Sequence, residues 1–176
     1  IITSFAGGTT ILSNVGTVKT DGVDLAGTFH FGRAFSFYDG ISYNRSKYED
    51  SYLSGTTVVP TAGKTVPNTP AWMNKFVATA TFGGVETQLS GDYVGKRYAT
   101  YTNDLDVPGY FLMGLAVSGK VPLSVAYVKH LRWSLSVTNL LNRAGPLQPV
   151  VGQASGSYAT YPIPPRMGFF TLKADI

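Results

Sequence analysis

The sequence predicts an all-β fold, an antiparallel segment of a transmembrane β-barrel wall, from three observations. About seven segments carry an apolar side chain at every second position, which is the period of a strand whose two faces differ. No segment shows the helical period, and 20 glycines and 10 prolines interrupt the chain too often for long helices. Neither a helix nor a second apolar set is available to cover the apolar face, so lipid is its expected covering.

Composition narrows the class further. The 176 residues include no cysteine, which excludes disulfides and thiolate metal sites. No run of about 18 apolar residues exists, so a spanning helix is excluded, whereas a spanning strand needs only about 9–11 residues. The net charge of +4 is scattered from Lys19 to Lys173, without the clustered patch that nucleic-acid binding requires. The opening IITSF contains no secretion signal, so we expect that a signal was removed or that residue 1 is an internal start.

Residues 23–31 and 35–44 are predicted to form a first hairpin around a tight turn at Gly32 and Arg33. Apolar and polar side chains alternate in both segments, except that Asp39 falls on the apolar face. A charge at mid-membrane costs about 2–4 kcal/mol for Arg or Lys and less for Asp. We therefore expect a β-bulge near Asp39 to turn its carboxylate toward the lumen.

Residues 72–82 and 85–96 are predicted to form a second hairpin, joined by Gly83 and Gly84. The strand from residue 85 is the most diagnostic, because its apolar side chains alternate with Glu, Gln, Ser and Asp. The side chains expected to line the lumen are Asp24, Glu86, Gln88, Asp92 and Lys96.

Three more strands are expected, around residues 111–117, 133–137 and 170–176. Residues 119–130 are ambiguous, because Pro122 cannot donate a hydrogen bond within a central ladder. Short turns on one rim and long loops on the other are typical of bacterial outer-membrane barrels. The predicted short turns are 32–34 and 83–84, and the predicted long loops are 49–70 and 139–165.

Five local sequences occur in an order that is familiar from one family: NVGTVKTDGVDLAGTF, VPNTPAWMNKF, VPGYFLMGLAVSG, LSVTNLLNRAG and YPIPPRMGFFTLKADI. Together they resemble the carboxy-terminal part of TonB-dependent outer-membrane receptors, and the resemblance covers nearly the whole chain. The residues that carry it are Gly22, Val23 and Asp24; Pro67, Pro70 and Trp72; Asn139, Leu140, Leu141 and Asn142; and Pro165 and Arg166.

The resemblance implies a barrel of about 22 strands with an amino-terminal plug inside it. Residues 1–176 would then be the carboxy-terminal part of that barrel, about seven or eight strands, with residues 1–5 as the end of the eighth. The plug and the amino-terminal strands would lie outside this sequence. An open sheet in lipid leaves two edges of unpaired backbone groups, so the remaining strands must come from elsewhere.

The same resemblance implies energised import of a scarce ligand, such as a ferric siderophore, a vitamin or an oligosaccharide. Its expected location is the bacterial outer membrane. The expected partners are the remaining barrel strands and plug of the same receptor, TonB through the missing amino-terminal part, outer-membrane lipid and a small-molecule ligand, but no nucleic acid.

No enzyme motif is present, and we expect no catalytic residues, metal site or cofactor. His30 and His130 are too far apart in sequence to suggest a ligand pair. Aromatic residues near strand ends are interpreted as an interfacial girdle, and those on outward loops are candidates for gripping a ligand, although loop packing explains them equally well. The girdle candidates are Trp72, Tyr93, Tyr98, Tyr101, Tyr110 and Trp133, and the ligand-binding candidates are Tyr48, Tyr52, Tyr158 and Tyr161.

Two other classes remain open from the sequence. One is a self-contained barrel of about eight strands that acts as a passive pore or adhesin and closes without a partner. The other is a secreted β-sandwich in which the apolar face packs on a second sheet. The membrane hypothesis requires that Phe76, Leu89 and Leu135 contact lipid rather than a protein interior.

Overall fold

The computed structural model describes residues 2–6, 9–13, 16–54, 56–121, 130–151 and 159–175. Within these ranges, no helix is long and apolar enough to cross a membrane. The strands are β1 (Ile2–Ala6), β2 (Thr9–Ser13), β3 (Val18–Phe31), β4 (Phe35–Tyr48), β5 (Tyr52–Ser54), β6 (Thr57–Val59), β7 (Trp72–Phe82), β8 (Val85–Val94), β9 (Arg97–Tyr98), β10 (Asp106–Val107), β11 (Tyr110–Val121), β12 (His130–Thr138), β13 (Pro146–Pro149), β14 (Thr160–Pro162) and β15 (Met167–Asp175).

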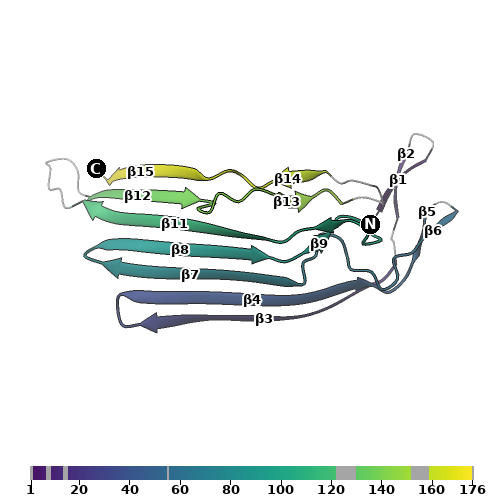
Figure 1. Ribbon diagram of the computed structural model, residues 1–176, viewed down its shortest axis with the longest axis horizontal. Helices are drawn as coiled ribbons and strands as arrows, with labels where there is room; N and C mark the ends of the chain where they lie inside the picture. Colours follow the sequence, from purple (N-terminus) through teal and green to yellow (C-terminus); the bar gives the residue numbers. More distant parts are fainter. Residues whose placement is uncertain are drawn as a thin grey trace.

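The long strands form one antiparallel sheet of 7 strands in the order β15-β12-β11-β8-β7-β4-β3. Each long strand pairs with the long strands before and after it in sequence, so the sheet is a simple meander (Figure 1). The all-β antiparallel prediction is confirmed. The hairpins predicted over residues 23–44 and 72–96 correspond to β3–β4 and β7–β8, with β8 ending at Val94.

Short turns lie at one end of the sheet and long connections at the other (Figure 1). Gly32, Gly83 and Gly84 in the short turns have φ of 65°, 56° and 80°, a region that glycine enters without a Cβ penalty. The ambiguous stretch is partly resolved, because residues 119–121 extend β11 and pair with residues 131–133 of β12. Residues 122–129 lie outside the described ranges.

One face of the sheet is apolar along its whole width, because residues directly opposite each other on paired strands share a face. One row across five strands shows the pattern: Phe37, Ala78, Leu89, Leu115 and Val137. No second layer of described residues covers this face, and the side chains of Leu135 and Phe170 remain 45% and 67% exposed. The buried apolar side chains lie instead at the long-loop end of the molecule: Tyr48, Tyr52, Ala99, Val107 and Ile163.

This arrangement disagrees with both alternative classes. The seven long strands form a single sheet, and no second layer of described residues packs on its apolar face, so Phe76, Leu89 and Leu135 do not face an interior of the described chain. The sheet is also open, since β3 and β15 are its edges and each pairs with one described strand. The expectation of an eighth strand from residues 1–5 is wrong, because β1 pairs with β2 in a separate hairpin.

The expected β-bulge at Asp39 is also wrong. The register of β4 is unbroken on both sides, with Asp39 opposite Gly27 on β3 and Phe76 on β7, so the carboxylate stays on the apolar face. The amide nitrogen of Asn74 donates a hydrogen bond to Asp39 Oδ1 at 2.8 Å and to the carbonyl oxygen of Gly40 at 3.1 Å. The side-chain amide of Asn74 on the neighbouring strand therefore hydrogen-bonds the Asp39 carboxylate on the apolar face, and no β-bulge turns it toward the lumen.

We expect Asn74→Leu to lower the free energy of unfolding by about 1–3 kcal/mol, because it leaves the Asp39 carboxylate without its donor in an apolar environment. Urea unfolding of the protein in lipid vesicles measures this change. The double variant Asp39→Leu, Asn74→Leu removes both polar groups and should recover most of the loss. An Asn74→Leu variant as stable as the parent would show that the pair contributes nothing.

Three aromatic rings lie side by side across the apolar face. Phe76 packs between Phe37 and Phe111, with ring centroids 6.1 and 6.2 Å apart. Its ring also covers Gly91, where an added Cβ would lie 2.6 Å from Phe76 Cζ. Glycine at this position therefore makes room for the ring.

The replacement Gly91→Ala is expected to destabilise the protein by about 1–3 kcal/mol, since the methyl group forces the Phe76 ring out of its stack. Comparison of unfolding free energies for Gly91→Ala, Phe76→Ala and the double variant tests this contact. The two effects should be non-additive, because the methyl group meets no ring once Phe76 is truncated. Strict additivity would contradict this interpretation.

Candidate functional site

The polar face of the sheet brings together four of the five side chains that the sequence assigns to the lumen. Asp24 lies opposite Ser42, and Glu86 lies opposite Thr81 and Ser118. Gln88 and Asp92 share that face on β8. Asp92 forms an ion pair with Lys75 at 3.9 Å, and both side chains are more than half exposed, so the pair contributes at most about 1 kcal/mol.

The structure places Lys96 apart from these four residues, beyond the end of β8 at the long-loop end of the molecule, which is called the rim from here on. Its Nζ lies 2.8 Å from Asp106 Oδ2 and 5.1 Å from the centroid of the Tyr98 ring. The hydrogen bond to Asp106 raises the pKa of Lys96, so the ammonium form is favoured. Lys96 therefore joins β9 to β10 at the rim.

Two of the ligand-binding candidates are buried in the rim. Tyr48 and Tyr52 are only 7% and 8% exposed, and both rings pack edge-on against Tyr101, with centroids 6.5 and 6.4 Å apart. Burial raises the pKa of Tyr52 and of Tyr101, which keeps these phenols neutral. In this conformation Tyr48 and Tyr52 contribute to packing at the loop end, and ligand contact by them stays a prediction.

The other two candidates differ from these. Tyr161 in β14 is 63% exposed and presents its ring at the surface of the loop end. Tyr158 lies outside the described residues. Ligand contact by Tyr158 or Tyr161 stays a prediction.

Polar side chains clamp the neighbouring loops onto this cluster. The Asn103 side chain accepts from the Thr65 amide at 2.6 Å and donates to the Thr65 carbonyl at 2.8 Å. The hydroxyls of Thr100 and Thr102 donate to Asp104, which holds the pKa of that carboxyl below its ordinary value. Because this depressed pKa favours the charged form, the turn is stabilised at neutral pH and loses that contribution as the carboxylate protonates in acid.

Arg97 is the main polar residue of the rim that sequence reasoning missed. It is only 4% exposed. Its Nη1 donates to the Leu147 carbonyl at 2.8 Å and to Asn68 Oδ1 at 3.4 Å, and its Nη2 donates to the Pro146 carbonyl at 3.5 Å. Its guanidinium also lies 5.4 Å from the centroid of the Tyr110 ring. One side chain thus joins three segments that are remote in sequence.

The asparagines of the NLLN motif connect the end of β12 to the start of β15. Asn139 is buried, with φ of 47°, and its amide donates to the carbonyls of Arg143 and Pro164 at 2.8 Å each. Asn142 Oδ1 accepts from the backbone amide of Arg166 at 3.2 Å. The two motifs at residues 139–142 and 165–166 therefore form one contact.

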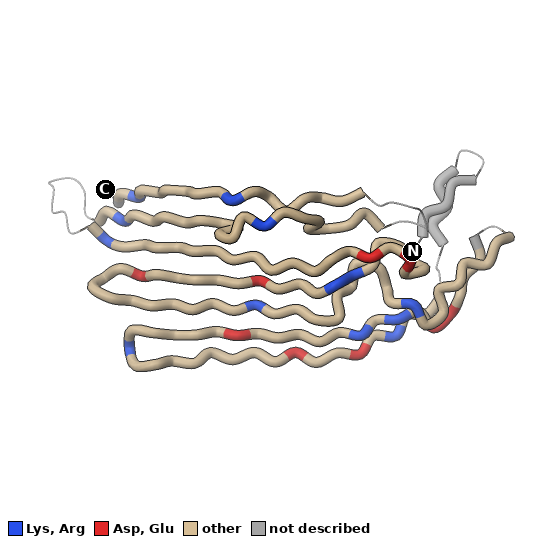
Figure 2. Tube along the Cα trace, in the orientation of Figure 1, with Lys and Arg blue, Asp and Glu red and all other residues tan. Residues whose placement is uncertain are grey.

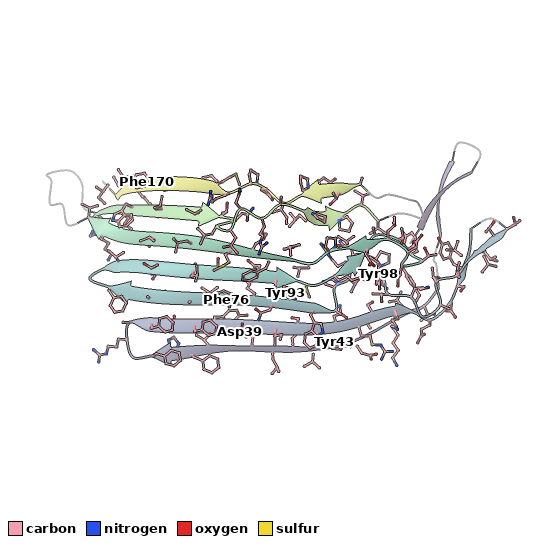
Figure 3. All side chains as sticks on the ribbon, viewed as in Figure 1. Asp39, Tyr43, Phe76, Tyr93, Tyr98 and Phe170 are labelled. Carbon is pink, nitrogen blue, oxygen red and sulfur yellow. The ribbon has the colours of Figure 1, made fainter. Side chains whose placement is uncertain are left out.

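The predicted aromatic girdle is divided between the sheet and the rim. Trp72 and Tyr93 occupy apolar-face positions near the ends of their strands, and Trp133 occupies one near the middle of β12. Tyr43 packs on Trp72 with 4.8 Å between ring centroids. Tyr110 lies on the polar face opposite Val94, and Tyr98 and Tyr101 belong to the rim, as Figure 3 shows for Tyr98. An apolar groove of about 350 Å³ lies beside this belt and is lined by Val23, Leu25, Ile41, Tyr43 and Trp72.

The charged residues of the described part of the chain show how the sheet is organised. In that part, no group of three or more His, Cys, Asp or Glu residues is placed to hold a metal ion. Charged residues occur at both ends of the sheet and also along the long strands, where Asp24, Asp39 and Lys75 lie within β3, β4 and β7 (Figure 2). The arrangement is suited to forming a wall with a polar and an apolar face.

Comparison with known proteins gives a consistent result. The family model described as TonB dependent receptor-like, beta-barrel matches residues 1–140. A search of curated proteins found no match. Solved structures do match, and these similarities, at 14–21% identity, concern the fold.

The ferric yersiniabactin uptake receptor FyuA from Yersinia pestis is 21% identical with a TM-score of 0.73, over 94% of this chain and 25% of that one. The siderophore receptor PiuA from Acinetobacter baumannii is 17% identical with a TM-score of 0.69, over 91% and 22%. The unliganded ferric citrate transporter FecA is 15% identical with a TM-score of 0.69, over 88% and 24%. This chain thus spans about a quarter of the length of these proteins.

Proposed function

The chain belongs to the TonB-dependent receptor β-barrel family, and on that premise we propose that residues 1–176 are the carboxy-terminal part of a receptor that imports a scarce ligand by energised transport. The family and the structural neighbours are transport receptors rather than enzymes, and the family implies the bacterial outer membrane. The observation that carries the proposal is the open sheet of 7 strands, with one uncovered apolar face and two edges.

In this proposal the sheet supplies one part of the barrel wall. The apolar face contacts outer-membrane lipid, and the polar face with Asp24, Glu86, Gln88 and Asp92 lines the lumen. Further strands of the same receptor pair with β3 and β15, because unpaired edges in lipid cost several kcal/mol for each exposed backbone group. The plug and the segment that engages TonB belong to the rest of the receptor.

The ligand is proposed to be a metal chelate of the ferric siderophore type. Support comes from the similar structures, whose names identify them as receptors or transporters for ferric citrate, siderophores, ferric yersiniabactin and copper. Tyr161, which is exposed at the loop end, is the described candidate for ligand contact, and contact by Tyr158, which lies outside the described residues, is a further part of the proposal. The sheet supplies no covalent chemistry in this mechanism.

Uptake of radioactive iron tests the proposal. Cells that lack the receptor gene are complemented with the full gene and offered ferric citrate, a ferric catecholate and a ferric hydroxamate in turn. We expect the gene to restore uptake of at least one chelate, and a protonophore or deletion of TonB to abolish it. Uptake that persists without TonB and without a proton gradient would instead identify a passive pore.

A further inference from the structure

Three cations lie directly opposite one another on adjacent strands at the short-turn end of the polar face. Lys120 of β11 pairs in register with Arg132 of β12, and Arg132 pairs with Lys173 of β15. Figure 2 shows the blue segments at these strand ends. Opposite residues on one face have Cβ atoms only about 4.5–5.5 Å apart, and like charges at that separation destabilise a sheet. This cation row therefore requires an explanation.

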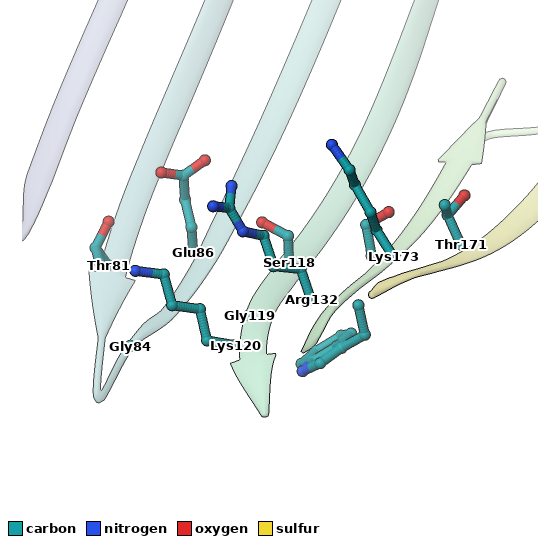
Figure 4. Close-up of a pocket in the computed structure, with 11 residues that line it drawn as sticks. Thr81, Gly84, Glu86, Ser118, Gly119, Lys120, Arg132, Thr171 and Lys173 are labelled. Atoms are coloured by element: carbon teal, nitrogen blue, oxygen red, sulfur yellow. The ribbon is translucent and has the colours of Figure 1, made fainter. Parts of the chain in front are cut away.

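The described side chains around the cation row do not balance its charge. The row borders a hollow of about 670 Å³ in the polar face, and Figure 4 shows the hydroxyls of Ser118 and Thr171 beside it. Among the described residues that line this hollow, Glu86 is the single carboxylate. The ion pairs between described side chains, Lys75–Asp92 and Lys96–Asp106, lie elsewhere. Cations and hydroxyl donors in this arrangement suit carboxylate oxygens.

We propose that the cation row is a docking surface for an acidic segment of the same receptor polypeptide, from outside residues 1–176. The inference rests on the proposed placement of the polar face toward the barrel lumen. Three strands spaced by about 4.8 Å set their backbone anchor points over about 10 Å, which suits several carboxylates along a peptide better than one small anion. Most of such a receptor lies outside this chain, which spans about a quarter of the similar structures.

Zero-length cross-linking tests the contact directly. A water-soluble carbodiimide joins a lysine amine to a carboxylate only when the two groups touch, and mass spectrometry identifies the joined peptides. In the purified full-length receptor in detergent, we expect Lys120 or Lys173 to be joined to an Asp or Glu outside residues 1–176. The Lys96–Asp106 pair, at 2.8 Å, is the internal positive control.

Several results would overturn the proposal. Two patterns count against it in a sample where Lys96 and Asp106 are joined: Lys120 and Lys173 unmodified, or both joined only to carboxylates within residues 1–176, such as Glu86. Either pattern leaves no place for an outside segment. Cross-links to a different protein, seen in whole outer membranes and absent from the purified receptor, would refute the assignment to the receptor's own polypeptide.

The sign of a melting-temperature shift gives a second test. If the cation row has no acidic partner, Arg132→Gln relieves repulsion and raises the Tm of the full-length receptor, which would contradict the proposal. If an acidic segment is docked, Arg132→Gln lowers the Tm. Arg132→Lys keeps the positive charge, so its Tm stays close to that of the parent receptor. Lys75→Gln is the matched control, because Lys75 is a cation of the same face whose partner, Asp92, is already on the sheet.

Two further comparisons distinguish the acidic segment from a small anion, and the docking surface from the transport function. Excess inorganic phosphate that raises the Tm of the parent receptor, but not that of Arg132→Gln, would identify a small anion as the occupant and contradict the proposed acidic segment.

Neither cross-linking nor melting requires a ligand or TonB. Failure of iron uptake with the cross-link intact would therefore refute the transport function alone, and the reverse result would refute the docking surface alone.

Discussion

Replacing Leu89 by arginine is expected to lower the free energy of unfolding in a bilayer by about 2–4 kcal/mol. Leu89 lies midway along β8 on the apolar face, between Ala78 of β7 and Leu115 of β11. A guanidinium there would face hydrocarbon near mid-membrane, where neither water nor a described acidic neighbour on that row can solvate it. Urea unfolding of the full-length receptor in lipid vesicles measures the loss, and assembly into the outer membrane should fall with it.

Gln88→Arg is the matched control for this prediction. Gln88 is the preceding residue of the same strand, and its side chain lies on the polar face opposite Thr79 and Ala116. The same arginine should be tolerated there, because the side chain reaches water in the lumen. Equal destabilisation by the two substitutions would show that the faces are not solvated differently, and the membrane assignment would then fail.

Replacing Arg97 by leucine is expected to destabilise the rim by about 2–3 kcal/mol, the range for loss of hydrogen bonds between a charged group and half-buried partners. The change removes the donors to the Leu147 and Pro146 carbonyls and the contact with the Tyr110 ring. Because these contacts join loops rather than long strands, the loss should appear first as faster protease cleavage within residues 139–165 of the folded receptor.

Arg97→Lys separates the charge from the geometry. A lysine keeps the charge but cannot donate to the two carbonyls through a planar fork, so it should recover only part of the stability. Arg143→Leu is a suitable surface control, because Arg143 is an exposed cation of the same loop. If Arg97→Leu and Arg143→Leu have equal effects on cleavage and unfolding, then burial of Arg97 contributes nothing to the rim.

The sheet itself could be predicted from the sequence because contact with lipid requires only a local pattern of apolar side chains. A strand such as β8 needs only apolar side chains at alternate positions, whatever protein lies nearby, so the period of Val85, Leu89 and Tyr93 is sufficient. The short turns were predictable for a similar reason, since Gly32, Gly83 and Gly84 mark positive φ by their type alone. The four polar residues on β3 and β8 follow from the same alternation.

The rim could not be predicted in this way, because its side chains meet partners remote in sequence. Tyr48 and Tyr52 have the composition of exposed loop residues, and only the return of Tyr101 to pack against them makes them buried. Likewise, Arg97 becomes a structural residue through contact with residues 146–147, about fifty positions later. Neither fact leaves a periodic signal in the sequence.

The sequence by itself thus determined the fold class, the two-faced strands and the family, since alternation along a strand and short motifs are properties of neighbouring residues. Only the tertiary structure decided that Asp39 stays on the apolar face beside Asn74, and that Lys120, Arg132 and Lys173 meet in one row. The physical reason is register: strand pairing decides which distant side chains become neighbours, and the residues within one strand do not encode it.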